Sequence, residues 1–186
     1  MSDSTTAAPT LYDFLRFWKD AGFEAWFKKD DAFDQTMRER FLALHEEVAV
    51  GGIDLWLTEP DEALAATILL DQLPRNAFRG TPRMFATDAR AKSMAERAIS
   101  AGHDQATEAE FRYFFYLPFE HSEELADQER SVALHEALGL EKITKYAIVH
   151  RDVIQKYGRF PHRNAVLGRT STAEETAFLE GGGFSG

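Results

Sequence analysis

The chain contains no cysteine among its 186 residues. This absence excludes disulfide bonds, thiol nucleophiles and zinc sites built on cysteine. It is typical of proteins that work in a reducing compartment, so we expect a cytoplasmic location. A chain of this length needs no disulfide to fold, because folding removes about 70% of its unfolded-chain surface from water.

Long apolar runs are also missing. A membrane-spanning helix needs about 18–20 consecutive apolar residues, and the longest run here, residues 63–70, is interrupted by Thr67. Residues 1–9 have neither a basic region nor an apolar region, so we expect no secretory signal there and a disordered tail. The sequence therefore predicts no membrane partner.

Basic residues are in the minority. Lysine and arginine number 21 against 31 aspartates and glutamates, which gives a formal net charge of −10. Proteins that neutralise nucleic-acid phosphates present a basic surface, so general nucleic-acid binding is not expected. One stretch is locally basic, with a single acid, Asp152, among five basic residues: Arg151, Lys156, Arg159, Arg163 and Arg169. If the protein meets an anion, we expect the contact in this stretch.

The pattern typical of β-sheets is absent, since there are no alternating β-branched runs and no Asn-Gly turns. Apolar residues instead recur every three or four positions, beginning with Leu11, Phe14, Leu15 and Trp18. Thr10 and Asp13 predict a capping box for this first helix, which we expect to stop near Gly22. Proline predicts the ends of two later helices, at Pro74 and Pro118. The sequence thus predicts an all-α fold of antiparallel helix pairs.

The apolar content is sufficient for one core. The hydrophobic fraction is 44% and includes 15 phenylalanines, and the length fits one domain by the prior of about 150 residues per domain. We expect a single all-α domain over residues 10–180. The glycine-rich residues 181–186 are expected to form a flexible tail.

Three segments, residues 70–79, 116–124 and 158–164, carry more polar groups than a connector needs. In each, apolar anchors and a proline precede the polar groups, and such anchors would hold those groups rigidly. With one histidine from the preceding helix, they give a set of candidate ligand-binding residues: Arg75, Asn76, Arg79, Glu120, His121, His150, Arg159, His162, Arg163 and Asn164.

Each candidate also has a structural interpretation. Arginine and asparagine after a helix commonly bind its free carbonyl groups, and acids after Ser122 suit the first turn of a helix. His150 lies on an apolar helical stripe; buried alone it would be neutral, and beside Glu120 or Glu124 it would be held charged. The other three histidines, His45, His103 and His135, are expected at the surface.

The three segments resemble those of the bacterial family DUF924, domain of unknown function 924. The resemblance rests on Leu-Asp-Gln-Leu-Pro-Arg-Asn-Ala-Phe-Arg-Gly at 70–80, Leu-Pro-Phe-Glu-His-Ser-Glu at 117–123 and Gly-Arg-Phe-Pro-His-Arg-Asn at 158–164. It continues through Leu167-Gly168-Arg169 to Ser171, and Phe17-Trp18 also fits. The resemblance implies a degenerate tetratricopeptide-like right-handed superhelix. It implies no activity and no cofactor.

Three functions are compatible with these residues. The first is a binding module that holds an anionic small molecule or a peptide carboxylate in a concave pocket lined by arginine and histidine. The second is a hydrolase, metal-dependent or acid–base, that uses His121, His150 and His162 with Glu120 and Glu124. The third is a scaffold in which the same groups form buried ion pairs. No metal-binding motif is present, and the sequence identifies neither a cofactor nor an oligomeric state.

Overall fold

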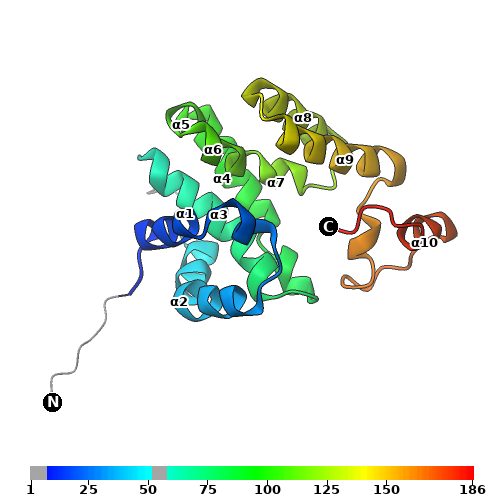
Figure 1. Ribbon diagram of the computed structural model, residues 1–186, viewed down its shortest axis with the longest axis horizontal. Coiled ribbons are helices and arrows are strands. Elements are labelled where there is room, and N and C mark those ends of the chain that lie inside the picture. The colour runs from blue at the N-terminus through cyan, green and yellow to red at the C-terminus, as the bar shows by residue number, and fades with distance from the viewer. Residues whose placement is uncertain (1–7, 52–57) are drawn as a thin grey trace, which may run out of the picture.

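Every regular element in the described part of the chain is a helix. The computed structural model describes residues 8–51 and 58–186, and Figure 1 shows the arrangement of the helices. The elements in chain order are α1 (Leu11–Phe27), α2 (Asp31–Val50), α3 (Pro60–Ala77), η2 (Pro82–Phe85), α4 (Asp88–Ser100), α5 (His103–Ala106), α6 (Ala109–Arg112), η3 (Tyr113–Phe115), α7 (Leu117–Glu120), α8 (Leu125–Leu138), α9 (Glu141–Tyr157), η4 (Pro161–Arg163) and α10 (Ala173–Glu180). The all-α prediction is confirmed. Most of the predicted disordered tail lies outside the described residues.

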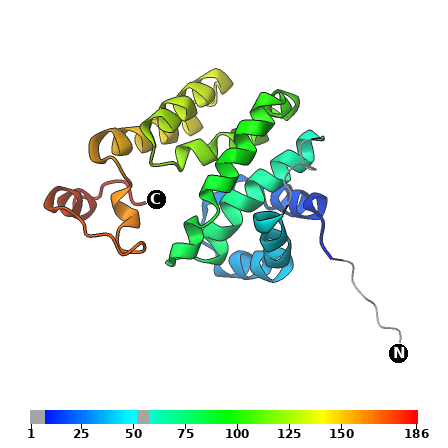
Figure 2. The same cartoon turned by 180° about the vertical axis from the view of Figure 1, so that it is seen from behind.

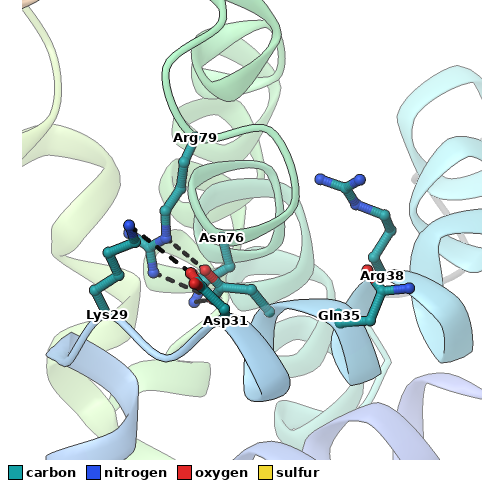
Figure 3. A pocket seen from close by; sticks show the side chains of 7 residues that line it. Lys29, Asp31, Gln35, Arg38, Asn76 and Arg79 are labelled. Carbon is teal, nitrogen blue, oxygen red and sulfur yellow. Dashed lines mark hydrogen bonds and ion pairs between the residues drawn. The ribbon is translucent and has the colours of Figure 1, made fainter.

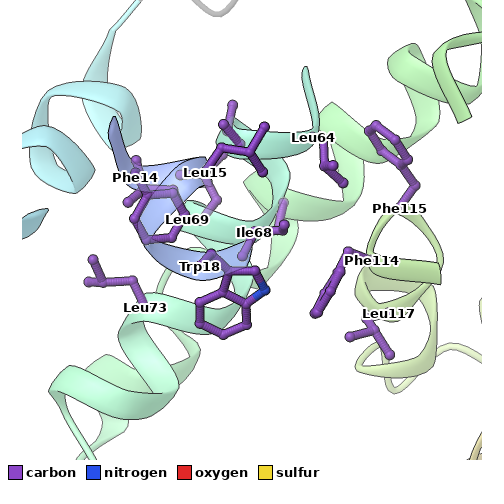
Figure 4. Close-up of a cluster of buried hydrophobic side chains, with 14 of the residues drawn as sticks. Phe14, Leu15, Trp18, Leu64, Ile68, Leu69, Leu73, Phe114, Phe115 and Leu117 are labelled. Carbon is purple, nitrogen blue, oxygen red and sulfur yellow. The ribbon is translucent and has the colours of Figure 1, made fainter. Parts of the chain in front are cut away.

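Helix α3 is the centre of the fold. It packs against α1, α2, α4, α5, α7, η2 and η3, and every residue from 63 to 74 is buried. A helix that is apolar on all sides is stable only when it is surrounded by other elements. Figure 4 shows Leu64, Ile68 and Leu69 of α3 among aromatic rings of α1 and η3. The apolar run read from the sequence is thus the buried central helix.

Pro74 does not end α3, which continues to Ala77. A proline inside a helix has no N–H for the carbonyl group four residues earlier, which here belongs to Leu70. The hydroxyl group of Thr87 donates to that carbonyl oxygen at 2.6 Å. Pro118 likewise does not end a helix, because it lies in the first turn of α7. Both predicted helix ends were therefore wrong, and at Pro74 a partner from outside the helix explains why.

The capping box at Thr10 is confirmed, since Thr10 and Asp13 exchange hydrogen bonds at the start of α1. The predicted stop at Gly22 is a kink. Gly22 has a φ of +76°, and the helical path resumes after it. Beyond the kink, Trp26 stacks on Trp18 and its indole N–H donates to the carbonyl oxygen of Trp18 at 2.6 Å.

The C-terminal part has a smaller core of its own. Helices α8 and α9 pack together and are joined by Gly139 and Leu140 alone. Val153, Ile154 and Phe160 form a second buried cluster, against which Phe178 and Phe184 pack. Figures 1 and 2 show the chain returning from α10 toward the middle of the molecule. Phe184, in the tail predicted to be flexible, therefore lies beside α9 in this structure.

No helix in residues 8–51 and 58–186 is long and apolar enough to cross a membrane. Successive long helices pack in pairs, α2 on α3, α3 on α4 and α8 on α9. Helix pairing is what the sequence predicted, and the right-handed superhelix stays a prediction.

The aromatic cluster around α3 gives the first test. Phe41 is fully buried and meets Phe14 edge-on at 5.2 Å between ring centroids. We expect Phe41→Ala to lower the free energy of unfolding by about 3–5 kcal/mol, because the cavity left behind adds to the lost burial. Urea denaturation measures this loss. Tyr12→Ala, at a half-exposed ring of α1, is the control, and an equal small loss in both variants would contradict this core assignment.

Candidate functional site

A pocket of about 1040 Å³ lies between α1, the end of α3, α7, α9 and residues 182–186. Its aromatic residues include Trp26, Tyr146 and Phe184. The polar residues include three from α3, the last residue of α7 with its neighbour, and one from α9: Gln72, Arg75, Asn76, Glu120, His121 and His150. The first two candidate segments thus meet at one pocket.

The carboxylate of Asp71 organises the polar side of this pocket. Asp71 is 1% exposed. Nδ1 of His121 donates to its Oδ1 at 2.8 Å, and Nε2 of Gln72 donates to its Oδ2 at 2.6 Å. Arg75 Nη1 lies 3.3 Å from Oδ1. Burial raises the pKa of Asp71, but Arg75 and His121 outweigh burial and hold the pKa well below its usual range, so this carboxyl group is ionised.

His121 presents a free ring nitrogen to the pocket. An ionised carboxylate can only accept, so Nδ1 of His121 carries the proton and Nε2 keeps its lone pair. Burial and the nearby Arg75 cation lower the pKa of His121, although Asp71 opposes them. Nε2 has no hydrogen-bond partner among the described residues, and His121 lines the pocket. His121 is therefore a neutral, oriented base.

Glu120 and His150 form a close, uncharged pair. Oε1 of Glu120 lies 3.1 Å from Nδ1 of His150, which donates to the carbonyl oxygen of Tyr146 at 2.9 Å. Burial and the charge of Asp71 raise the pKa of Glu120 to about 8. Burial, with His121 next, lowers the pKa of His150 to about 3. The expectation that a neighbouring glutamate would keep His150 charged is wrong, because burial opposes charge on both groups.

His135 is the second histidine beside Glu120. Its Nε2 lies 3.9 Å from Oε2 of Glu120, and its Nδ1 donates to the carbonyl oxygen of Ser131 at 2.8 Å. Burial lowers the pKa of His135 to about 4. The sequence placed His45, His103 and His135 at the surface, and all three are buried. Apolar spacing alone did not reveal this.

The two arginines of the first segment, Arg75 and Arg79, are already paired. Arg75 forms a two-fold hydrogen bond with Asp88 at 2.8 and 3.0 Å. Arg79 donates to Asp34 at 2.6 and 3.2 Å, and Asn76 donates to the same carboxylate at 2.7 Å. Arg79 and Asn76 also line a smaller pocket, of about 230 Å³, on the α2 side. Figure 3 shows both side chains there. Since both residues line both pockets, they form part of the wall between them.

The third segment supports the pocket from outside. Arg163 lies between the rings of Phe85 and Phe160, each 4.5 Å from its guanidinium carbon, and donates to the carbonyl oxygen of His121 at 3.0 Å. Phe160 contacts the ring of His150 edge-on at 5.6 Å. This segment therefore fixes the positions of two pocket histidines.

The other candidates of that segment bond elsewhere. Arg159 donates twice to Glu175, and Asn164 donates to Ser171 and Glu175. The ring of His162 lies 5.2 Å from that of Phe184. The pocket lining includes none of Arg159, His162, Arg163 and Asn164, so ligand contact by these four stays a prediction without support from the pocket.

Asp71, Gln72 and Asp88 are the site residues that sequence reasoning missed. Asp71 and Gln72 interrupt an otherwise apolar helix, and a buried acid in such a position needs compensating partners. That interruption was the available signal. Among the described residues no group of three or more His, Cys, Asp or Glu side chains is placed to hold a metal ion.

Comparisons with known proteins give the chain's relatives. The model of a family described as "Bacterial protein of unknown function (DUF924)" matches residues 14–183. A solved structure of a protein of unknown function from Agrobacterium tumefaciens is similar, with 46% sequence identity and a TM-score of 0.89 over 92% of this chain and 97% of that one. No curated protein matches the chain.

The protonated state of Glu120 predicts a pH dependence of stability. The unfolded glutamate loses its proton near pH 4.5, and the folded one near pH 8. Between these values the folded Glu120 holds a proton that the unfolded one has lost, so the contribution of this group to the free energy of unfolding falls as the pH rises, by up to about 1.4 kcal/mol per pH unit. The buried histidines, whose pKa values are lowered, act in the opposite direction below about pH 6.5, so each variant is compared with the wild type at the same pH. Glu120→Gln imitates the protonated acid, and its free energy of unfolding minus that of the wild type should rise from pH 5.5 through 7 to 8.5 in urea denaturation. Glu124→Gln, at an exposed neighbour, should show no such rise, and a constant difference between Glu120→Gln and the wild type would refute the assignment.

Arg163 gives the third test. Its removal leaves Asp88, which lies 3.5 Å away, with one cation fewer and opens a gap between two phenylalanine rings. We expect Arg163→Ala to lower the free energy of unfolding by about 3–5 kcal/mol. Arg16→Ala removes an exposed pair with Asp13 and should lower it by less than about 1 kcal/mol. Similar small losses of stability in both variants would instead mean that Arg163 is not needed for folding and is available to bind a ligand.

Proposed function

The chain belongs to the bacterial family DUF924, and we propose that it is an enzyme that binds a small molecule in the central pocket and hydrolyses it by acid–base catalysis. The observation that carries the proposal is the Asp71–His121 pair. The buried carboxylate of Asp71 fixes the imidazole ring of His121, so the unprotonated ring nitrogen can accept a proton from a molecule in the pocket. General bases in enzymes have this arrangement.

The acid of the proposal is Glu120, next to His121 in the chain. Its raised pKa keeps it protonated at neutral pH, whereas His121 is unprotonated there. Acid–base catalysis requires two neighbouring groups, one kept protonated and the other kept unprotonated by its surroundings. Oε2 of Glu120 is buried without a hydrogen-bond partner among the described residues. Its other oxygen, Oε1, lies 3.1 Å from Nδ1 of His150, which lines the pocket.

The chemical step follows from these roles. His121 Nε2 takes a proton from water while the water oxygen forms a bond to the electrophilic atom of the substrate. The bond to the leaving group breaks, and the leaving group receives the proton of Glu120. Proton return from His121 to Glu120 then restores both residues. His162 and Glu124, which the sequence included as possible catalysts, do not line the pocket.

Binding of an anionic small molecule or peptide carboxylate is the second candidate. Lys28, Arg79 and Lys142 line the pocket and support it. Arg75 and Arg79 support anion binding less than the sequence suggested, because carboxylates already compensate their charges. We also propose that the protein is cytoplasmic and that its helices form a superhelix.

Hydrolysis of 4-nitrophenyl esters, phosphates and glycosides tests the enzyme proposal. We expect turnover of at least one class, a loss of about 10²–10⁴-fold in His121→Asn, and wild-type rates in Glu124→Gln. The rate of the wild type should fall as the pH rises above about 8, where Glu120 loses its proton, and Glu120→Gln should lack that descent. Release of 4-nitrophenol at equal rates by wild type and His121→Asn would disprove the proposal.

A further inference from the structure

Two residues that line the pocket, Gln72 and His121, are held by the same carboxylate, that of Asp71, and each keeps one hydrogen-bond acceptor. Gln72 donates to Oδ2 and His121 donates to Oδ1, at 2.6 and 2.8 Å. Because a carboxylate only accepts, the amide group of Gln72 must turn its nitrogen toward Asp71 and its oxygen away. The same argument directs Nε2 of His121 away from Asp71. Both residues line the pocket.

The side-chain oxygen of Gln72 is not bound by any described residue, although Gln72 is only 6% exposed. No described residue donates to Oε1, and it is not among the atoms sealed from solvent without a partner. A second Asp-Gln pair in the chain gives the contrast. Gln105 donates to Asp104 at 2.8 Å in the same way, but its oxygen accepts a hydrogen bond from Arg112 at 3.3 Å. An acceptor left free at a pocket is available to a ligand.

The charged groups around the two acceptors restrict which donor group of a ligand they can bind. The two carboxylates and two guanidinium groups behind the acceptors, Asp71, Asp88, Arg75 and Arg163, balance one another. A cation would gain no net attraction from this cluster. An anion would face two lone pairs and no free N–H from Gln72 or His121. The acceptors therefore suit an uncharged N–H or O–H group.

The aromatic residues of the pocket narrow the rest of the ligand. Trp26, Tyr146 and Phe184 line the same pocket, and flat apolar faces of this kind pack well against a ring. We propose that Gln72 Oε1 and His121 Nε2 recognise an uncharged amide or hydroxyl group carried on a ring-shaped small molecule. The proposal rests on the pocket of the proposed function and names a ligand class for it. Such a group occupies the Nε2 lone pair that would take the proton of water, so this ligand binds in place of the water and does not require turnover.

Three matched probes test it by nuclear magnetic resonance titration of the wild-type chain. Benzamide carries a neutral donor, benzoate an anion and benzamidine a cation on the same ring. We expect benzamide to bind with a roughly millimolar dissociation constant, about tenfold or more tighter than the other two, and to shift the Nε2 resonance of His121. Equal or tighter binding of benzoate or benzamidine, or no saturation by benzamide below about 20 mM, would overturn the proposal.

A pair of variants tests the role of Gln72. Gln72→Met removes the free oxygen at similar volume, and we expect benzamide to bind about tenfold more weakly, since a lost hydrogen bond of ordinary strength has about this effect. Gln105→Met removes the matching Asp-Gln contact outside the pocket and should bind benzamide like the wild type. Unchanged affinity in a folded Gln72→Met would refute the assignment; if that variant does not fold, the three-probe comparison decides.

The two proposals fail separately. Selective benzamide binding without any hydrolysis would leave the ligand class standing and remove the catalytic role. Hydrolysis that depends on His121, together with no preference among the three probes, would remove only the recognition of a neutral donor.

Discussion

The buried charge of Asp71 is the constraint on which the pocket depends. An ionised carboxyl group in the interior is stable only when donors surround it, and its donors come from α3 and from the end of α7. Arg75 extends the network to Asp88 at the start of α4, and Asp88 to Arg163 in η4. One run of alternating charges thus ties together the three polar segments that are far apart in the sequence, and it sets the direction of every pocket group attached to it.

The helical class was predictable because glycine, proline and capping residues act locally. Thr10 with Asp13 specifies a helix start whatever surrounds it, and the structure has the capping box there. The last helix likewise begins with a capping box, at Thr172 and Glu175. The helix end at Pro118 was mispredicted because this proline lies in the first turn of α7, where a proline is tolerated, whereas the helix end at Pro74 was mispredicted for a non-local reason. A proline is tolerated inside a helix when another group satisfies the freed carbonyl, and Thr87, which does so at Leu70, is distant in the sequence.

The candidate site, too, was predictable where the signal is local and was not predictable where it depends on distant residues. Arg75, Asn76, Arg79, Glu120, His121 and His150 line one pocket, and all of them except His150 were selected by their proximity to Pro74 or Pro118. The sequence could not show which charges are already compensated, because the partners Asp34, Asp88 and Glu175 lie 13 to 45 residues away. This is why a set of arginines suggested an anion site, whereas the structure has mostly paired arginines and a neutral, oriented histidine.

The protonation states around Glu120 argue for a function beyond structural support. Burial keeps Glu120, His135 and His150 uncharged at neutral pH. Each must lose hydration on folding, and Oε2 of Glu120 and Nε2 of His135 have no hydrogen-bond partner among the described residues. Apolar side chains of similar volume would fill the same space at lower free energy. Polar groups buried without partners in an apolar core are concentrated at functional sites. Here they lie next to His121, which lines the pocket. A scaffold would need the ion pairs of Asp71 and Asp88, but it would not need a neutral acid beside a neutral base.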